Sequence, residues 1–143
     1  MTRAEIVALF NRRDAAWQRH DPDALAADHH DEAVAVSPMH GRLEGRHRIR
    51  EVYQTWFAAF PDLTCTTDDL IVDGSRAVHF FTIKGTQAAP FGGVAPTGRR
   101  ISITGAWLYA FDGSGQIQED RRLYDVTSMM VQIGALRTKL PGD

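Results

Sequence analysis

The sequence has few of the features that mark secreted, membrane-bound or nucleic-acid-binding proteins. Its single cysteine, Cys65, cannot form an internal disulfide, which favours a cytoplasmic location. No apolar run approaches the roughly 18 residues of a membrane span. The formal net charge of -2 lacks the basic excess that binds nucleic acid. We therefore expect a cytoplasmic protein with neither a nucleic acid nor a membrane as partner.

Motifs of cofactor and metal sites are absent as well. The glycine-rich segment at 92–98 lacks the ending of a phosphate-binding loop and the glycine spacing of a dinucleotide fold. His29, His30 and Asp31 look like metal ligands, but neighbours at a helix end point apart, and no third ligand stands at a recognisable spacing. The sequence predicts no cofactor and no metal ion.

Apolar spacing predicts three helices before a run of strands. The helices are expected at 2–19, with Thr2 as N-cap and Glu5 three residues on, at 22–30, capped by Asp21, and at 45–60. Alternating segments predict strands at 33–37, 63–72, 77–84, 100–111 and 116–125, with a turn-rich connection at 38–45 and a short helix or turn at 126–134.

This order of elements indicates the α+β class, with helices on one face of a curved, mostly antiparallel sheet. With 143 residues the chain is expected to form one domain over 1–134, followed by a C-terminal tail at 135–143. A sheet wrapped around helices leaves a cone, and the open end of such a cone is the default ligand site.

Four segments resemble a known family. FGGVAPTGRR at 91–100, followed by TG at 104–105, is similar to the signature loop and strand of the SnoaL-like polyketide and ester cyclases of the NTF2-like superfamily. FAAFPDL at 57–63, DLIVDG at 69–74 and the segment 115–134 match that family in order and spacing. The resemblance implies an NTF2-like cone that binds a small apolar or aromatic carbonyl compound, and a homodimer formed by sheets that pair face to face.

The last hairpin gathers the candidate site residues. Its turn at 112–115 predicts a register in which Trp107 opposes Asp120 and Gly105 opposes Arg122. Gly105 would then leave room for Arg122 or a ligand. Strand alternation points one set of side chains into the cone: Trp107, Asp120, Arg122 and Tyr124.

The resemblance also implies a chemistry. An aspartate on the last strand of these cyclases is the general acid and base of an aldol ring closure, with a histidine on the preceding strand. Residue-by-residue matching places Arg122 at the position of the acid and Trp107 at that of the histidine. Arginine cannot transfer a proton, although it can bind an anion or stabilise an enolate. The nearest carboxylate on the same face is Asp120.

Three interpretations of Asp120 and Arg122 stay open. In the first, Asp120 transfers the proton and Arg122 stabilises the oxyanion. In the second, Arg122 binds a carboxylate or aromatic ligand together with Trp107 and Tyr124, without turnover. In the third, Asp120 and Arg122 form an ion pair on a half-exposed strand.

Further candidates come from other elements. His79 shares a strand face with Phe81 and is either a core histidine or a pocket base. His40 follows the first strand and is a candidate for the mouth of the cone. Trp17 and Trp56 are helix-borne core aromatics that, with Phe81, can also line the cavity.

The resemblance thus implies a polyketide or ester cyclase that works by cofactor-free, aldol-type acid–base chemistry. One alternative is an isomerase or dehydratase that uses Asp120 or His79. Another is a ligand-binding or dimerisation module without turnover.

Overall fold

The structure, a computed structural model, describes residues 1–137. Residues 138–143, and with them most of the tail expected at 135–143, lie outside the described part. The helices are α1 (Arg3–Arg19), α2 (Pro22–Ala27), α3 (Arg46–Ala59) and α4 (Val126–Gln132). The strands are β1 (His29–Ser37), β2 (Gly41–Glu44), β3 (Thr64–Asp73), β4 (Arg76–Thr86), β5 (Arg100–Phe111) and β6 (Ile117–Tyr124).

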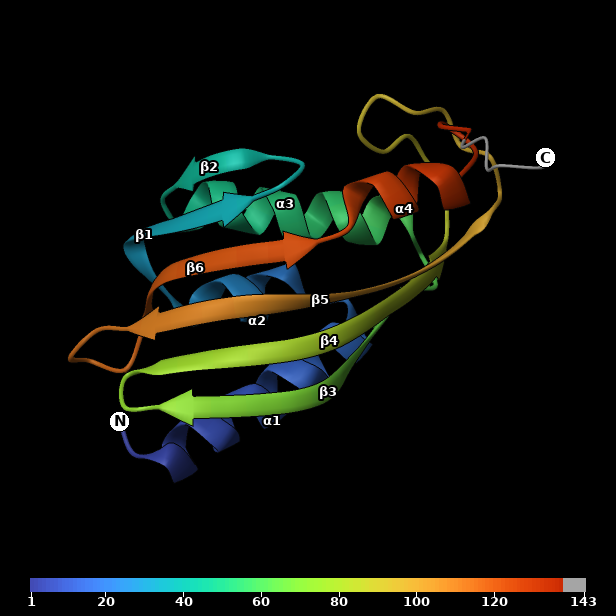
Figure 1. The fold of residues 1–143 in the computed structure, drawn as a ribbon. Coiled ribbons are helices and arrows are strands. Elements are labelled where there is room, and N and C mark those ends of the chain that lie inside the picture. Colours follow the sequence, from blue (N-terminus) through green and yellow to red (C-terminus); the bar gives the residue numbers. More distant parts are fainter. Residues whose placement is uncertain (138–143) are drawn as a thin grey trace.

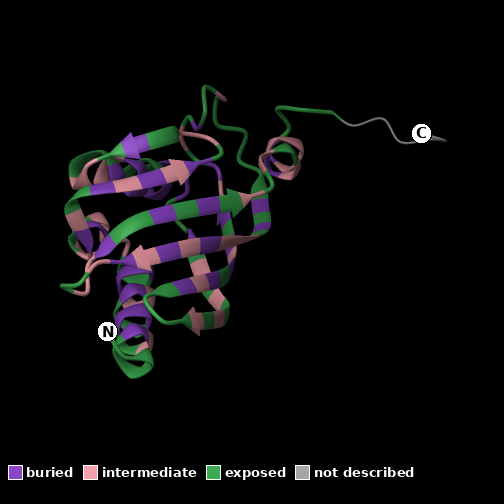
Figure 2. Cartoon of the chain, turned by 60° about the vertical axis from the view of Figure 1, so that its left-hand side comes forward, coloured by how far each residue is buried: buried purple, intermediate pink, exposed green. Residues whose placement is uncertain are grey.

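The six strands form one curved sheet in the order β2-β1-β6-β5-β4-β3, with α1, α2 and α3 on one of its faces (Figure 1). Neighbouring strands are antiparallel except β1 and β6, which run parallel. Buried residues alternate with more exposed ones along β4 and β5 (Figure 2), as expected for a sheet with helices on one face. The predicted α+β class, with a mostly antiparallel sheet packed on N-terminal helices, is confirmed.

Local sequence sets the starts of the first two helices. Thr2 Oγ1 accepts the Glu5 backbone N–H at 3.2 Å, and the Glu5 carboxylate accepts the Thr2 N–H at 2.7 Å, which completes a capping box. Asp21 Oδ1 accepts the backbone N–H of Ala24 at 2.9 Å, with Pro22 at the first helical position. Both predicted caps are confirmed.

The boundary predicted between the second helix and the first strand is wrong. α2 ends at Ala27, and β1 begins at His29, because this residue pairs with Ile117 of the distant strand β6. His29 and His30 therefore lie in a strand and point to opposite faces, His29 into the core. In addition, β2 replaces part of the expected turn-rich connection and pairs with β1.

The predicted register of the last hairpin is wrong by two residues. Trp107 opposes Arg122 rather than Asp120, and Gly105 opposes Tyr124 rather than Arg122. An irregularity between Ala110 and Phe111 shifts the ladder after the turn. Because the shift is even, each side chain keeps the face that the alternation predicts.

The room expected beside Gly105 is taken by a neighbouring side chain. A Cβ at this position would lie 2.6 Å from Cζ of Phe81 and 2.4 Å from the carbonyl oxygen of Leu123. The Phe81 ring, itself buried against Trp107 at a centroid distance of 5.4 Å, thus packs directly on the glycine. Gly105 serves close packing of two strands, not access for Arg122 or a ligand.

This packing predicts a large cost for Gly105→Ala. Because the Leu123 backbone and the buried Phe81 ring both have to shift, we expect a loss of about 1–3 kcal/mol in unfolding free energy, as for other overpacked cores. Gly113→Ala is the matched control, since a Cβ there meets no atom within 4 Å. Urea denaturation measures both variants. Equal stability of the two would contradict the assignment.

Candidate functional site

A buried ion pair lies at the centre of the inner face. Arg122 donates from Nε to Asp120 Oδ1 at 2.8 Å and from a terminal nitrogen to Oδ2 at 3.3 Å. His29 contacts the same Oδ2 through Nε2 at 2.8 Å. Asp120 is 0% exposed and Arg122 is 3% exposed. The ion pair of the third interpretation therefore exists, but it is buried, not half-exposed as expected.

Burial and neighbouring groups shift the pKa values of Asp120 and His29. Burial by itself raises the pKa of Asp120, but the positive charge of Arg122 and the hydrogen bonds from His29 and Arg122 lower it well below its usual range. Burial lowers the pKa of His29. Arg122 and His29 therefore together keep Asp120 ionised, and both of its oxygens are occupied.

Aromatic rings surround the Arg122 guanidinium. Its central carbon lies 4.6 Å from the ring centre of Trp107 on β5 and 5.0 Å from that of Tyr53 on α3. A second buried arginine, Arg13 of α1, fixes the other end of Tyr53 by donating to its hydroxyl at 2.8 Å. The position of Arg122 is thus set by helix, sheet and carboxylate together.

Arg122 also faces a small cavity between helices and sheet. The cavity volume is about 10 Å³, roughly the space of one water molecule. Neither Asp120 nor His79 lines it in the part of the chain that the structure describes. Its lining residues are Trp17, Ser37, Tyr53, Trp56, Phe81, Ile83, Trp107, Arg122 and Tyr124.

The surface of this cavity is almost wholly apolar, but several of the residues that line it carry hydrogen-bond donors. Trp107 Nε1 is buried and has no hydrogen-bond partner among residues 1–137. Beside it stand the guanidinium of Arg122 and the hydroxyl of Tyr124, which lies 3.3 Å from Ser37 Oγ. A cluster of donors on aromatic walls suits a carbonyl, enolate or carboxylate oxygen of an apolar ligand.

The glycine-rich loop between β4 and β5 packs beside this cavity. Buried Gln87 holds it, donating to the carbonyl of Val94 at 3.0 Å and accepting from the hydroxyl of Thr97 at 3.1 Å. Phe91 is buried against Trp56, with ring centres 4.6 Å apart, and its ring lies 6.2 Å from that of His40. The loop therefore adds an aromatic wall on the side where Trp56 lines the cavity.

His79 does not line the cavity, but its cross-strand partner Trp107 does. Its Nε2 contacts Thr67 Oγ1 at 2.8 Å, and that hydroxyl in turn donates to Asp14 at 2.8 Å. Because Thr67 gives its proton to Asp14, His79 donates from Nε2, and its buried Nδ1 has no partner among the described residues. Burial, together with the charge of Arg13, lowers the pKa of His79 to about 4.

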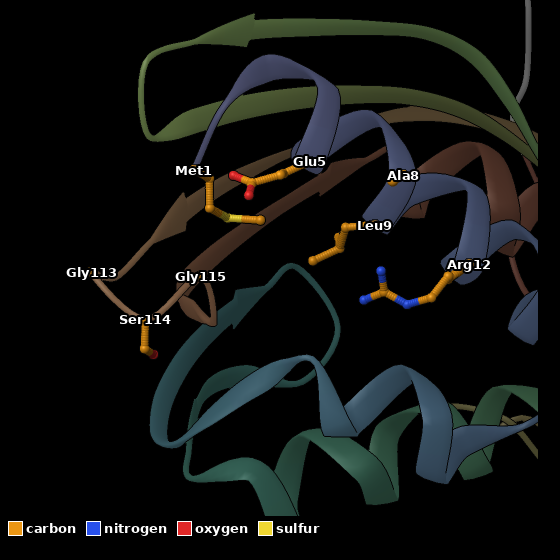
Figure 3. A pocket seen from close by; sticks show the side chains of 8 residues that line it. All are labelled: Met1, Glu5, Ala8, Leu9, Arg12, Gly113, Ser114 and Gly115. Carbon is orange, nitrogen blue, oxygen red and sulfur yellow. The ribbon is translucent and has the colours of Figure 1, made fainter.

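A wider hollow of about 490 Å³ lies outside the cone, between the start of α1 and the turn that joins β5 to β6. Figure 3 shows Glu5 and Arg12 on one side of it and Ser114 on the other. None of the residues around the buried ion pair reaches this hollow, so we place the site in the cone. Across residues 1–137, no group of three or more His, Cys, Asp or Glu side chains could hold a metal ion.

The fold and the inner-face site match a known family. The family model described as SnoaL-like polyketide cyclase matches residues 8–133. The chain belongs to the SnoaL-like polyketide cyclase family. The predicted family resemblance is confirmed, and with it the NTF2-like fold of the cone.

None of the curated proteins matches the sequence. No helix in the described part is both long and apolar enough to cross a membrane.

Solved structures agree with this assignment. TsrD from Streptomyces laurentii is 29% identical, with a TM-score of 0.85 over 95% of this chain and 99% of its own. AclR from Streptomyces galilaeus, for which a hydroxylase activity has been suggested, is 24% identical, with a TM-score of 0.83 over 95% and 100%. IdmH from Streptomyces antibioticus, a suggested polyketide cyclase, is 24% identical, with a TM-score of 0.73 over 90% and 97%. The last two show the fold alone.

The structure brings together most, but not all, of the predicted site residues of this SnoaL-like protein. Trp17, Trp56, Phe81, Trp107, Arg122 and Tyr124 share the cavity. Asp120 contacts Arg122 and His79 is buried in the core, and neither lines the cavity. Sequence reasoning missed His29, whose partner Asp120 stands 91 residues away. It also missed Ser37, which the period-two burial of β1 could have placed on the inner face.

The buried pair predicts a selective loss of stability. In Asp120→Asn the charge of Arg122 stays buried without its carboxylate, so we expect unfolding free energy to fall by about 3–5 kcal/mol. Glu119→Gln is the matched control. It removes the exposed partner of Arg121 on the same strand, 4.0 Å away, and should cost at most about 1 kcal/mol. Urea denaturation compares the two, and similar losses would contradict a structural role of the Asp120–Arg122 pair.

Proposed function

We propose that the protein is a polyketide or ester cyclase-type enzyme that binds a small apolar or aromatic carbonyl compound in the cone. The observation that carries this proposal is the Arg122 guanidinium. It is buried and fixed by Asp120, and Arg122 lines an aromatic cavity. A fixed positive charge in a site that excludes water stabilises negative charge that develops on a substrate oxygen.

Arg122 and Asp120 have different roles in this proposal. Arg122 lines the cavity and contacts the substrate oxygen, first as a carbonyl and then as an enolate. Asp120 is a positioning residue, because its two oxygens are engaged by Arg122 and His29 and its lowered pKa keeps it ionised. A carboxylate in this state is a poor general acid and has no contact with the cavity.

The aldol-type reaction needs this enolate. Removal of a proton next to a carbonyl leaves the electron pair on the substrate, and Arg122 stabilises it until the carbon attacks a second carbonyl of the same molecule. An isomerase or a dehydratase would pass through the same enolate and remains the alternative within this site. His79 is a weak candidate for the base, since its pKa is lowered to about 4 and it does not line the cavity.

A module that binds without turnover is the second candidate. It is favoured by the small cavity volume of about 10 Å³ and by the ability of an arginine to hold a carboxylate tightly without further chemistry. Any substrate larger than water has to displace side chains or the loop that carries Phe91. Binding alone and turnover therefore have to be separated by experiment.

Deuterium exchange separates them. We expect the protein to accelerate exchange at the activated C–H of 1,3-dicarbonyl and anthraquinone-type esters in heavy water, followed by NMR. Arg122→Gln should lower this rate by about 100-fold or more, the cost of removing one oxyanion donor. Arg121→Gln is the matched control, because Arg121 is exposed on the same strand.

Circular dichroism first establishes that both variants are folded. A folded Arg122→Gln variant that exchanges at the wild-type rate would contradict the role of Arg122. If the wild type catalyses no exchange but carries a tightly bound compound that the Arg122 variant loses, the binding module is the correct reading.

We also propose that the partner on the outer face of the sheet is a second copy of this chain. Ile71, Phe80 and Leu123 are exposed there by 52%, 38% and 59%. Phe80 and Leu123 flank Ala106 in one row across the strands. A two-fold axis through β4 and β5 would bring Arg121 at one side of the patch near the acidic edge strand β3 of the partner.

A new charge tests the homodimer. We expect the wild type to sediment as a dimer at tens of micromolar, roughly the range of moderate protein affinities. Leu123→Lys should shift it to a monomer, because the lysine would be buried in the apolar contact. Gln18→Lys adds the same charge to the exposed side of α1 and should leave the dimer intact. A monomeric wild type would remove the proposal.

A further inference from the structure

The site still needs a group that accepts the substrate proton, and neither Asp120 nor His79 touches the cavity. We propose that Tyr124, Ser37 and His40 form a proton relay from the cavity to the edge of the cone. Tyr124 touches the substrate, Ser37 passes the proton on, and His40 is the terminal acceptor. This inference rests on the proposed carbon-acid chemistry of the Arg122 site.

The relay is built where two parallel strands end. β1 and β6 run side by side in the same direction, so Ser37 at the end of β1 meets Tyr124 at the end of β6. The Tyr124 hydroxyl lies 3.3 Å from Ser37 Oγ, which lies 3.5 Å from Nδ1 of His40. Ser37 and Tyr124 both line the cavity, whereas half-buried His40 stands behind them. Long contacts of this kind tighten when a substrate closes the site.

The directions of the hydrogen bonds determine which way a proton moves through the relay. Ser37 Oγ accepts the backbone N–H of His40 at 3.4 Å, which leaves one more lone pair and one proton on this hydroxyl. The lone pair accepts the Tyr124 proton, and the Ser37 proton points to Nδ1 of His40. The arrangement requires the imidazole tautomer that carries its hydrogen on Nε2, with Nδ1 free as a base.

Burial and nearby positive charges keep His40 unprotonated, so its Nδ1 can accept a proton. Burial, then the positive charges of Arg122 on β6 and Arg48 on α3, lower the pKa of His40. The Phe91 ring beside it carries no charge, and the imidazole is therefore unprotonated at neutral pH. In contrast, the other tyrosine of the cavity, Tyr53, is held by a hydrogen bond from Arg13 and has no link to a histidine base through such a hydroxyl.

The proton steps balance without a co-reactant. The substrate C–H proton moves to the Tyr124 oxygen while the Tyr124 proton moves to Ser37 and the Ser37 proton moves to His40 Nδ1. The C–H electron pair stays on the substrate as an enolate facing Arg122. The enolate carbon forms a bond to the second carbonyl carbon, and the electron pair of that C=O becomes an alkoxide. The alkoxide then takes a proton back through the same three residues, and His40 returns to its neutral state.

The pH profile of deuterium exchange tests the relay. For the wild type we expect the rate to rise with pH as His40 loses its proton and to level off above about pH 6.5, the ordinary histidine value, because the His40 pKa is lowered. His40→Gln and Ser37→Ala should remove this rising limb and lower the plateau by about 100-fold. Tyr124→Phe should lower the rate similarly, and Ser37→Thr should restore part of it.

The matched control is His47→Gln, which removes an exposed imidazole of α3 paired with Glu51 and should keep the wild-type profile. A folded His40→Gln variant that retains both the limb and the plateau overturns the relay. If Arg122→Gln abolishes exchange while His40→Gln does not, the proposed function stands and the relay alone fails.

A second measurement decides the relay independently of turnover. Nitrogen-15 NMR of the histidine rings should show His40 as the Nε2–H tautomer, with a pKa below about 6.5 that changes in Ser37→Ala but not in His47→Gln. A His40 ring that carries its hydrogen on Nδ1, or that titrates identically with and without the Ser37 hydroxyl, overturns the proposal even if no substrate has been found.

Discussion

The structure depends on one constraint: a guanidinium is buried inside an aromatic cone and has to be paired there. Moving such charges out of water is costly, and a buried pair is favourable only when geometry and additional hydrogen bonds are good. Asp120 meets this requirement with two contacts to Arg122, and His29 occupies the carboxylate oxygen that accepts the longer one. The contact between His29 and Asp120 consequently joins β1 to β6, while Tyr53 and Trp107 beside Arg122 add α3 and β5.

The same constraint explains why the cavity is small. Rings packed on Arg122 exclude water, which strengthens its interaction with Asp120 and equally with any substrate oxygen that enters. A ligand has to displace some of these rings or their neighbours, and Phe91, which packs on the cavity residue Trp56, is carried by a loop instead of a helix or strand. Its anchor Gln87 is buried, so the loop has a defined resting position that binding must change. Tight packing of the resting state and space for a substrate are therefore in competition.

Sequence reasoning was most accurate where structure is determined locally. The cap at Thr2, the start of α2 after Asp21 and the alternation of β5 all depend on residues close in the chain, and all three were predicted. The parallel pairing of β1 with β6 depends on segments that are distant in the chain. The start of β1 and the role of His29 were therefore not predicted. The predicted hairpin register was wrong because of an irregularity next to the turn. The error was an even number of residues, so Trp107 and Arg122 still face inward as predicted.

The resemblance places Arg122 at the position of the family's acid. Proton transfer and stabilisation of negative charge would then fall to different residues in this protein. Arg122 can stabilise negative charge but cannot take the proton, so the proton acceptor has to stand elsewhere. Asp120 cannot fill that role, because Arg122 needs this carboxylate two residues earlier on the same face. Burial and, after it, the positive charge at the centre lower the pKa of His40. The base that we propose at the edge of the cone, linked through hydroxyl groups, is consistent with the positive charge at its centre.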